Sequence, residues 1–503
     1  MPQPPHGDQQ HRAILQRIAQ EAMLERGLRP DFSAAVLAEL DKIQTAVGLN
    51  DKSVRDASEI RDLTGLLWAS IDNDDSRDLD QLTIADSLPG DKVRIGVAVA
   101  DVDALVKDGS AIDQHARHNT TSVYTAAQIF PMLPEKLSTD LTSLNFGEER
   151  LAVVVEMVIG ADGSLQDSDI YRARVCNHAR LTYSSVAAWL EGNGTVPEEI
   201  TAVKGLADNL RMQDQIAQSL KKLRHIHGAL SLKTISAKPI FDGDQISDLQ
   251  TEHKNRAKEI VEDFMIAANG VTARYLAAKK FPSIRRVVRT PKRWDRIVEL
   301  AQEYGSRLPA NPDSVALAEF LVKTQAANPQ QFPDISLAVI KLLGAGEYIA
   351  EQPGDKTPDH FGLAVKDYAH STAPNRRYTD LITQRLLKAA VAGQPVPYSY
   401  AELDVLARHF TAKEDAANKV ERQVGKSAVA LLIESRIGEQ FEAIVTGASD
   451  KGTWVRLLQI PVEGRVVHGF EGVDVGDRIH VQLISTNLER GFIDFKRVSS
   501  ASN

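Results

Sequence analysis

Cysteine is almost missing from the sequence, because Cys176 is the only one in 503 residues. A single cysteine excludes an intrachain disulfide and favours a reducing compartment, so we expect a cytoplasmic protein in which this thiol is buried and inert. Long apolar runs of the length that a membrane span needs are also missing. The first ten residues lack the basic and then apolar pattern of a secretory signal. We therefore expect no association with a membrane.

An excess of positive charge is missing too, since the net charge is −9. This balance argues against indiscriminate coating of nucleic acid but is compatible with a local basic channel. Basic residues cluster at 221–224, 285–293 and 376–377, and any one such cluster alone is typical of a solvated helix or strand edge. Hydrophobic residues make up 43% of the chain, which is ordinary for a globular protein of two or three domains.

Acidic residues, in contrast, are concentrated in one place, where five aspartates lie within the nine residues from Asp72 to Asp80. Such a run is most often a solvated loop, and a calcium loop is a second interpretation. The calcium pattern fails because positions six and twelve from Asp72 hold Arg77 and Thr83 instead of Gly and Glu. The apolar runs at 66–69 and 93–100 predict core strands on both sides, which would hold the acidic turn in place.

The spacing of these aspartates suits a divalent cation. Asp78 and Asp80 are two residues apart, so on an extended segment both project to the same side, and Asp72 can reach that point from across a turn. Hard cations such as Mg²⁺ take oxygen ligands. Three converging carboxylates are the minimum for a two-metal phosphoryl-transfer site, so the sequence predicts a metal site here.

Hydrophobic periodicity predicts an α+β protein divided along the chain. We expect a disordered tail at 1–10, a helical, helix-turn-helix-like module at 11–60, a large domain at 61–436, a small β-barrel at 437–498 and a tail at 499–503. The clearest expected helices of the large domain are Glu199–His227, Lys254–Lys280, Asp313–Ala327, Arg376–Val391 and Tyr400–Glu434.

The last part of the chain is punctuated by glycine and reads as about five short strands in about 60 residues, a pattern typical of an OB barrel. OB barrels commonly bind single-stranded nucleic acid by stacking bases on aromatic rings. Phe441 and Trp454 are candidates for such stacking. The alternative for both is the barrel core, which we favour slightly for Phe441.

Several motifs in a fixed order resemble the ribonuclease II / ribonuclease R family, also called the RNB family. They are Ile71–Gln81, Val99–Val102, Thr121–Tyr124, Phe130–Ser138, Ser143–Asn145, Val261–Asn269, His360–Ala364 and Arg376–Leu381 with Arg385. The resemblance covers about Leu63 to Val498. It implies an RNB catalytic domain, with a mixed sheet surrounded by helices, followed by an OB-fold barrel. It also implies a short form without the usual N-terminal cold-shock domains.

The resemblance implies a processive 3′-to-5′ exoribonuclease that binds the 3′ end of single-stranded RNA as a monomer. Such an enzyme hydrolyses RNA to 5′-nucleotides by two-metal chemistry with Mg²⁺, or with Mn²⁺ as the alternative. The metal positions of the family fall on Asp72, Asp78, Asp80 and Gln81, where Gln81 replaces an aspartate. A Gln carbonyl can bind Mg²⁺ but brings no charge. A catalytically weakened RNA-binding protein on the same fold is therefore the alternative function.

Two residues are implied to carry the chemistry. Asp80 is the metal ligand that we expect to tolerate change least. Arg376 matches an arginine that clamps the scissile phosphate, and the alternative for it is an ion pair with a nearby carboxylate. The preceding Asn375 departs from the family, which has an apolar residue there, so the loop that carries Arg376 is expected to lie in a slightly different position than in the family.

Further residues are implied to contact RNA. Tyr124 matches a tyrosine that stacks on the 3′-terminal base, while the partner ring of that clamp falls near Leu232. Glu262 matches a carboxylate near the terminal ribose, where a 2′-hydroxyl distinguishes RNA from DNA. Tyr183 and Glu421 match positions that line the same end of the channel. Arg377, from the basic pair at 376–377, and Trp454, from the barrel, are the other predicted RNA-binding residues. Ordinary packing or a surface charge is the alternative for Tyr183 and Glu421.

Overall fold

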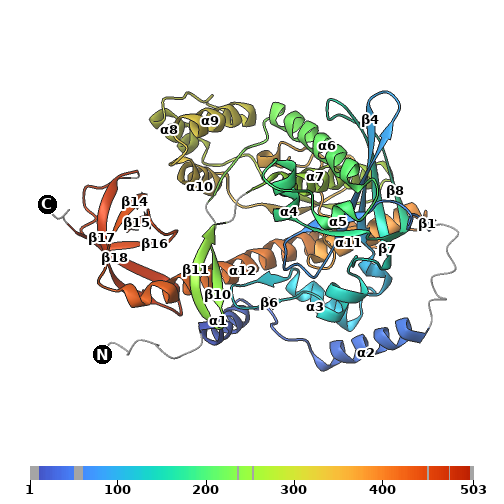
Figure 1. Ribbon diagram of the computed structural model, residues 1–503, viewed down its shortest axis with the longest axis horizontal. Coiled ribbons are helices and arrows are strands. Elements are labelled where there is room, and N and C mark those ends of the chain that lie inside the picture. Colours follow the sequence, from blue (N-terminus) through green and yellow to red (C-terminus); the bar gives the residue numbers. More distant parts are fainter. Residues whose placement is uncertain are drawn as a thin grey trace.

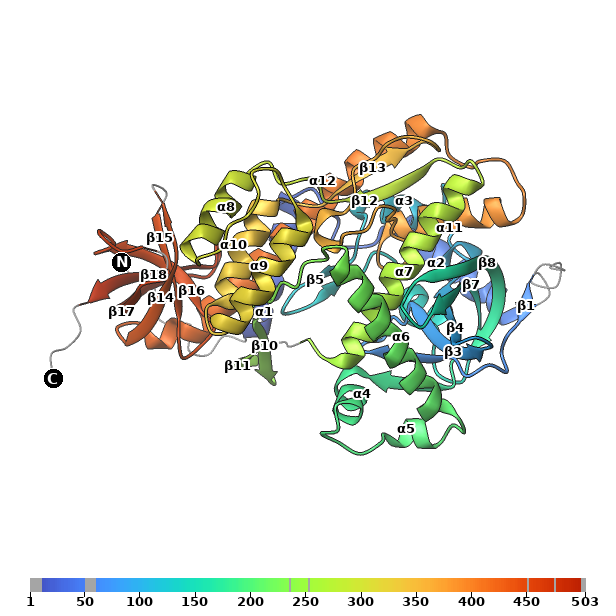
Figure 2. The same ribbon diagram turned by 90° about the horizontal axis from the view of Figure 1, so that it is seen from above.

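The computed structural model describes residues 11–49, 60–234, 237–251, 254–449, 452–474 and 476–498. The tails expected at 1–10 and 499–503 lie outside these ranges. Figures 1 and 2 show an elongated molecule with a large mixed domain towards one end and a β-barrel at the other. None of the helices in the described ranges is long and apolar enough to cross a membrane.

A mixed sheet forms the centre of the large domain. Within the described residues it has seven strands in the order β1-β8-β7-β4-β3-β2-β9, and the β1–β8 and β2–β9 pairs are parallel. The strands are β1 (Arg61–Asp62), β2 (Ala69–Asp72), β3 (Gln81–Leu88), β4 (Lys92–Ala100), β7 (Glu149–Gly160), β8 (Leu165–Cys176) and β9 (Ala179–Thr182). The near-continuous apolar run in β4 is buried on both faces, as is typical of a central strand.

Helices pack around this sheet, as the resemblance implies. They are α3 (Ala111–Asn119), α4 (Tyr183–Leu190), α5 (Glu198–Thr201), α6 (Leu206–Ile226), α7 (Arg256–Ala278), α11 (Tyr378–Val391) and α12 (Tyr400–Ile433). Helix α6 lies against β3, where Thr83 Oγ1 donates to Gln213 at 2.7 Å. The helix expected at Glu199–His227 is interrupted at Gly205, whose φ of +87° suits glycine and breaks the helical path.

A helical subdomain lies between the sheet and the barrel (Figure 2). It contains α8 (Trp294–Glu303), α9 (Ser314–Ala327) and α10 (Phe332–Leu343), which share their own apolar core. Two strand pairs also fall in the region that sequence analysis assigned mainly to helices. They are β10 (Ala237–Asp242) with β11 (Gln245–Thr251), and β12 (Ser283–Val287) with β13 (Glu347–Glu351). The first pair turns at an Asp-Gly step, which is a turn signal that the sequence analysis did not use.

The carboxyl-terminal domain is a closed barrel, as expected. Its described residues form five strands in the order β14-β15-β16-β18-β17. They are β14 (Gln440–Ser449), β15 (Gly452–Leu457), β16 (Glu463–His468), β17 (Arg478–Asn487) and β18 (Phe492–Val498). Phe441 is 3% exposed and belongs to the barrel core, whereas Trp454 is 38% exposed on the surface. Helix α12 runs from the large domain to this barrel (Figure 1).

The amino-terminal helices pack on different parts of the large domain. Helix α1 (His11–Glu25) packs against α12, and α2 (Ala34–Leu49) packs against α3. They are separated by the stretch around Pro30, where proline ends one helical pattern before the next begins. The helix-turn-helix-like arrangement of residues 11–60 stays a prediction.

Candidate active site

The acidic loop is held between two strands of the central sheet. Asp72 is the last residue of β2, and the buried Asp80 directly precedes β3. Side chains from β9 and α4 fix the loop between them: Arg180 donates to the carbonyl of Ser76 at 2.6 Å, and Ser184 donates to Asp74 at 3.1 Å. The loop is therefore anchored, in agreement with the interpretation that core strands place it.

A second loop, residues 371–377, which we call the arginine loop, binds both oxygens of the Asp80 carboxylate. The backbone N–H of Asn375 donates to Asp80 Oδ1 at 3.0 Å, and Arg376 Nε donates to Asp80 Oδ2 at 3.3 Å. The side chain of Arg376 remains 42% exposed. The ion pair foreseen as the alternative for Arg376 thus exists, but its partner is the motif aspartate itself, and part of the guanidinium still faces solvent.

Tyr124 connects the acidic loop to α12. It lies in the short strand β5 (Val123–Tyr124), which pairs with β6 (Ile129–Phe130). Its hydroxyl donates to Asp78 Oδ2 at 3.1 Å, and its backbone N–H donates to Glu421 Oε1 at 2.8 Å. Tyr124 as a whole is 41% exposed. Asp78, Tyr124 and Glu421, which are far apart in the sequence, therefore meet in one place.

Electrostatics show that the carboxylates share a small, poorly solvated space. Burial raises the pKa of the Asp80 carboxyl to about 7, an effect that the Arg376 guanidinium opposes and Asp78 reinforces. Burial also raises the pKa of Asp72, which senses the same two neighbours. Tyr183, at the start of α4, has its pKa raised by burial and by the charge of Asp72. The structure therefore brings the three aspartates, Arg376 and both tyrosines together.

The donor set fits a hard divalent cation. As the side chains stand, no three His, Cys, Asp or Glu residues within the described ranges are arranged to hold a metal. The carboxylates face Tyr124, Asn375 and Arg376 instead. All three aspartates nevertheless offer oxygen, the ligand that Mg²⁺ and Mn²⁺ prefer, and the burial that raises the pKa of Asp80 disfavours its ionised form, which a bound cation would stabilise. Gln81 is the half-buried first residue of β3, so its predicted ligand role rests on its place in the motif.

A cavity of about 510 Å³ adjoins this site. Glu262 and Leu232 line it, together with the cationic residues Lys221, Arg224, Lys233, Lys254 and Lys258. Glu262 accepts from Lys254 at 2.9 Å. Lys258 Nζ lies 5.8 Å from the centroid of the Tyr183 ring, which links the cavity to the Asp72 side of the site. Glu262, which is implied to lie near the terminal ribose, thus lines a cavity that holds both cationic residues and the carboxylates Glu259 and Asp263.

Arg377 differs from its neighbour. Its NH2 group donates to Asp380 Oδ1 at 2.8 Å, and the Asp380 side chain is fully buried and also accepts from the Ala373 N–H at 2.9 Å. The structure therefore favours a positioning role for Arg377 within the loop over the predicted RNA contact. Sequence reasoning missed Asp380, although its place three residues after Arg377 at the start of a helix was an available signal.

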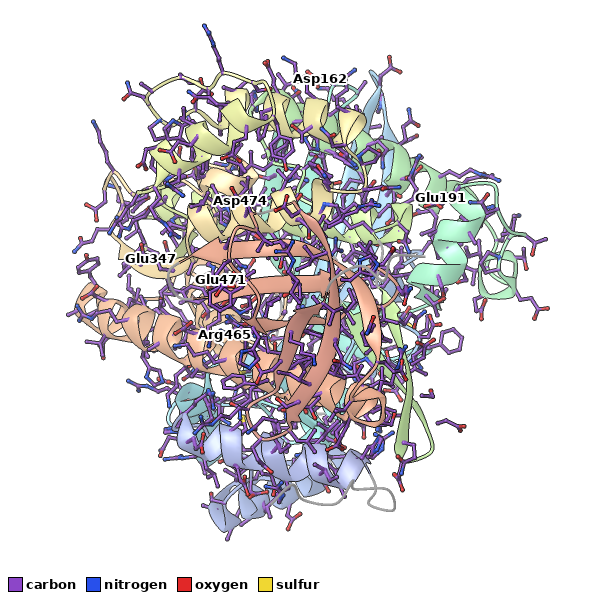
Figure 3. The ribbon with its side chains drawn as sticks, turned by 90° about the vertical axis from the view of Figure 1, so that its left-hand side faces the viewer. Asp162, Glu191, Glu347, Arg465, Glu471 and Asp474 are labelled. Atoms are coloured by element: carbon purple, nitrogen blue, oxygen red, sulfur yellow. The ribbon has the colours of Figure 1, made fainter. Side chains whose placement is uncertain are left out.

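Trp454 lies away from the aspartates, on the surface of the barrel. It pairs across strands with Arg465, which faces the viewer in Figure 3. Directly opposite residues on neighbouring strands point to the same face of a sheet. An exposed indole ring and a guanidinium therefore share one side of the barrel.

Two family models match the chain. The RNB domain matches residues 60–393, and the RNase II-type exonuclease C-terminal S1 domain matches residues 439–498. Ribonuclease R of Vibrio parahaemolyticus is 30% identical over 481 residues, which is 88% of this chain and 56% of the relative. Exoribonuclease 2 of Escherichia fergusonii is 33% identical over 407 residues, which is 79% of this chain and 61% of the relative. The chain thus spans less than two thirds of the length of these curated relatives.

Solved structures with the same fold include two kinds of protein. Mycoplasma genitalium RNase R in complex with ribose methylated single-stranded RNA has a TM-score of 0.85 at 22% identity, covering 96% of this chain and 78% of that one. Yeast Ssd1, described as a pseudonuclease, has a TM-score of 0.67 at 17% identity, covering 83% of this chain and 51% of that one. At these identities, the likeness shows the fold alone.

Proposed function

Because the chain belongs to the RNB family, as a domain match over most of its length shows, we propose that it is a hydrolytic 3′-to-5′ exoribonuclease. Its substrate would be single-stranded RNA, degraded processively to 5′-nucleotides. The observation that carries the proposal is the meeting of three aspartates and Arg376 in one small site. Carboxylates that can hold cations, next to a guanidinium that can hold a phosphate, are the parts that phosphodiester hydrolysis requires.

The aspartates and the arginine of the site would have different roles. Asp72, Asp78 and Asp80 would hold Mg²⁺ or Mn²⁺, with Gln81 as a fourth, uncharged ligand. A bound ion of this kind supplies Lewis-acid chemistry for a water molecule and for the phosphate. Arg376, anchored through Nε to Asp80, would direct its exposed N–H groups to the scissile phosphate and stabilise the charge that builds on it.

RNA would be held by its bases, its ribose and its phosphates. The exposed ring of Tyr124 is fixed through its hydroxyl to Asp78 and offers a face to the 3′-terminal base, a contact that contributes about 1–3 kcal/mol in other proteins. Leu232 would supply only an apolar contact where the family has a second ring. Glu262 would accept a hydrogen bond from a 2′-hydroxyl, and the cavity's lysines would neutralise phosphates.

The experiment that tests this function is product analysis on a 5′-labelled oligoadenylate, with the released nucleotides separated by chromatography. With Mg²⁺ we expect the labelled strand to pass directly from full length to a short 5′-end product while unlabelled 5′-AMP accumulates, because the enzyme is proposed to be processive and the carboxylates need a cation to act. Chelator should stop the release, and added Mg²⁺ or Mn²⁺ should restore it. RNA that is retarded in a gel but stays intact under all of these conditions would contradict the enzymatic function.

That contrary result would favour the second candidate, a catalytically weakened RNA-binding protein. The observation in its favour is Gln81, which removes one negative charge from the metal positions. The likeness to a pseudonuclease is compatible with it but concerns the fold alone. The contacts between Asp80, Asp78, Tyr124 and Arg376 favour the enzyme, because they keep the remaining charged groups in one site.

The barrel surface gives a prediction on RNA affinity. In Trp454→Ala, affinity for single-stranded RNA should fall about tenfold, because one base loses an aromatic surface on which to stack. The affinity is measured by fluorescence anisotropy with chelator present, so that the RNA stays intact. Phe470→Ala removes another exposed ring of the same barrel, 40% exposed, and should change the affinity less than twofold. Equal RNA affinities of the two variants would show that Trp454 does not stack on a base and has only a structural role.

A further inference from the structure

A short buried segment behind the site contacts both of its loops. It comprises Thr142, Ser143 and Leu144, which are 4%, 0% and 1% exposed, and we call it the buried clip. It follows a π-helical turn, Lys136–Leu141. None of its hydroxyl groups points to solvent, so their contacts are internal and specific.

The clip holds the acidic loop through its backbone. Ser143 Oγ accepts from the N–H of Leu79 at 3.0 Å and lies 3.2 Å from the carbonyl of Arg77. The N–H of Leu144 donates to the carbonyl of Leu79 at 3.0 Å. These bonds fix the chain on both sides of Asp78 and directly before Asp80.

The same clip holds the arginine loop through one side chain. Thr142 Oγ1 donates to Asn375 Oδ1 at 2.5 Å and also lies 2.9 Å from the carbonyl oxygen of Leu137, and Asn375 is fully buried. The backbone N–H of Asn375 binds Asp80, and Arg376 follows directly. Two adjacent residues, Thr142 and Ser143, therefore hold the arginine and the aspartates from one piece of backbone.

The asparagine at position 375 has no evident benefit for the stability of the fold. Asn375 Nδ2 is buried without a hydrogen-bond partner among the described residues. Leaving such a donor unsatisfied destabilises a fold, and an apolar side chain would avoid that cost. What the asparagine does provide is the acceptor for Thr142.

We propose that Thr142, Ser143 and Asn375 are positioning residues that set the distance between Asp80 and Arg376. Adjacent residues on one backbone cannot move apart, so the clip transmits a fixed spacing to both loops. Displacements of about 1 Å at a catalytic group can reduce turnover about a hundredfold, which is why such spacing matters. The inference rests on the proposed function, since it concerns the same site.

The test compares Thr142→Val, which loses the hydroxyl at nearly the same volume, with Thr142→Ser, which keeps it. Turnover of oligoadenylate should fall at least about tenfold in the valine variant, with KM for RNA changed less than about twofold. The serine variant should recover to within about threefold of the unaltered chain, because the contact to Asn375 is restored. Thr83→Val is the matched control, since Thr83 is a buried threonine that donates to Gln213 at 2.7 Å.

Comparison with the control decides the outcome. Both valine variants should lose similar thermal stability, because each loses one buried hydrogen bond, but only Thr142→Val should lose turnover. Asn375→Ala should lower turnover to a similar degree, and the double variant should be no worse than either single one, since both changes break the same contact. A Thr142→Val variant with the turnover of Thr83→Val would overturn the proposal.

A second measurement separates this inference from the proposed function. Mn²⁺ binding to the RNA-free chain is followed by electron paramagnetic resonance, which needs no turnover. Thr142→Val and Asn375→Ala should weaken Mn²⁺ binding about fivefold or more relative to Thr83→Val, because Asp80 loses its fixed orientation. If the unaltered chain binds Mn²⁺ but cleaves no RNA, the proposed function fails, and this comparison still decides on the clip. Equal Mn²⁺ affinities, or no Mn²⁺ binding at all, would overturn the positioning role.

Discussion

Asp80→Asn should reduce single-turnover RNA cleavage by at least about a thousandfold, because both the metal site and the contact to Arg376 depend on this carboxylate. The amide could still accept the N–H of Asn375 through its oxygen. Its nitrogen would then face Arg376 Nε, where two donors meet instead of a donor and an acceptor. Release of 5′-AMP from labelled oligoadenylate at saturating Mg²⁺ measures this effect.

Measuring RNA affinity should distinguish a loss of catalysis from a loss of substrate binding. Affinity of Asp80→Asn for RNA should stay within about twofold, since Asp80 is 2% exposed and offers no surface for stacking. Asp75→Asn is the matched control: it removes the same charge from the same loop, at a side chain that is 79% exposed. It should keep its turnover. Retained turnover in Asp80→Asn would remove Asp80 from its role, and equal losses in both variants would show that only the charge of the loop matters.

The part of this site that sequence could predict is the part encoded by short spacing. Asp78 and Asp80 are two residues apart, and the apolar run at 93–100 does lie in β4, whereas the run at 66–69 enters β2 only at Ala69. The glycine-punctuated tail does close into a barrel, with Phe441 inside and Trp454 outside. For Phe441 and Trp454 the period of the side chains along a strand decides which face they occupy, and that period is visible in the sequence.

The part that sequence could not predict depends on partners far along the chain. Arg376 and Arg377 are neighbours with the same side chain, yet one binds Asp80, 296 residues away, and the other binds Asp380. Thr142 and Asn375 are 233 residues apart, so nothing local indicates that they meet. The partner of Arg377 lies in the first turn of α11, whereas the partner of Arg376 directly precedes β3. The family resemblance supplied Arg376 because no local pattern shows the long-range contact.

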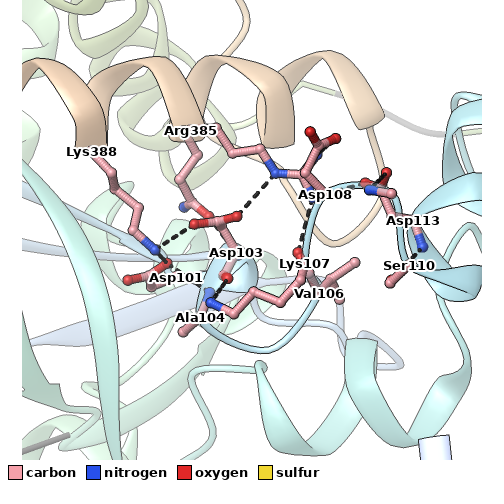
Figure 4. Close-up of polar contacts among 12 residues, drawn as sticks. Asp101, Asp103, Ala104, Val106, Lys107, Asp108, Ser110, Asp113, Arg385 and Lys388 are labelled. Atoms are coloured by element: carbon pink, nitrogen blue, oxygen red, sulfur yellow. Dashed lines mark hydrogen bonds and ion pairs between the residues drawn. The ribbon is translucent and has the colours of Figure 1, made fainter. Parts of the chain in front are cut away.

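A third arginine, Arg385, lies at the centre of an ionic network in which α11 is joined to the segment after β4 (Figure 4). Its guanidinium forms ion pairs with Asp103 at 3.0 Å, Asp108 at 3.2 Å and Asp113 at 2.8 Å. Asp113 also accepts from the hydroxyl of Tyr378, the first residue of α11, at 2.9 Å. The network thus holds the start of α11 directly after the arginine loop.

Arg385→Met should therefore destabilise the fold by about 3–5 kcal/mol, because Asp113, only 2% exposed, would keep a buried charge without its partner. In differential scanning calorimetry this corresponds to a fall in Tm of roughly 3–7 °C, because the entropy of unfolding grows with chain length. Arg408→Met is the control, since Arg408 is 69% exposed and pairs with Asp404 on the surface of α12 at 2.9 Å. Such a surface pair contributes at most about 1 kcal/mol. Similar Tm values for the two variants would show that the buried charges are stabilised by the surrounding hydrogen bonds instead of by Arg385. A large difference would show that Arg385, for which no RNA contact is predicted, sets the stability on which the arginine loop depends.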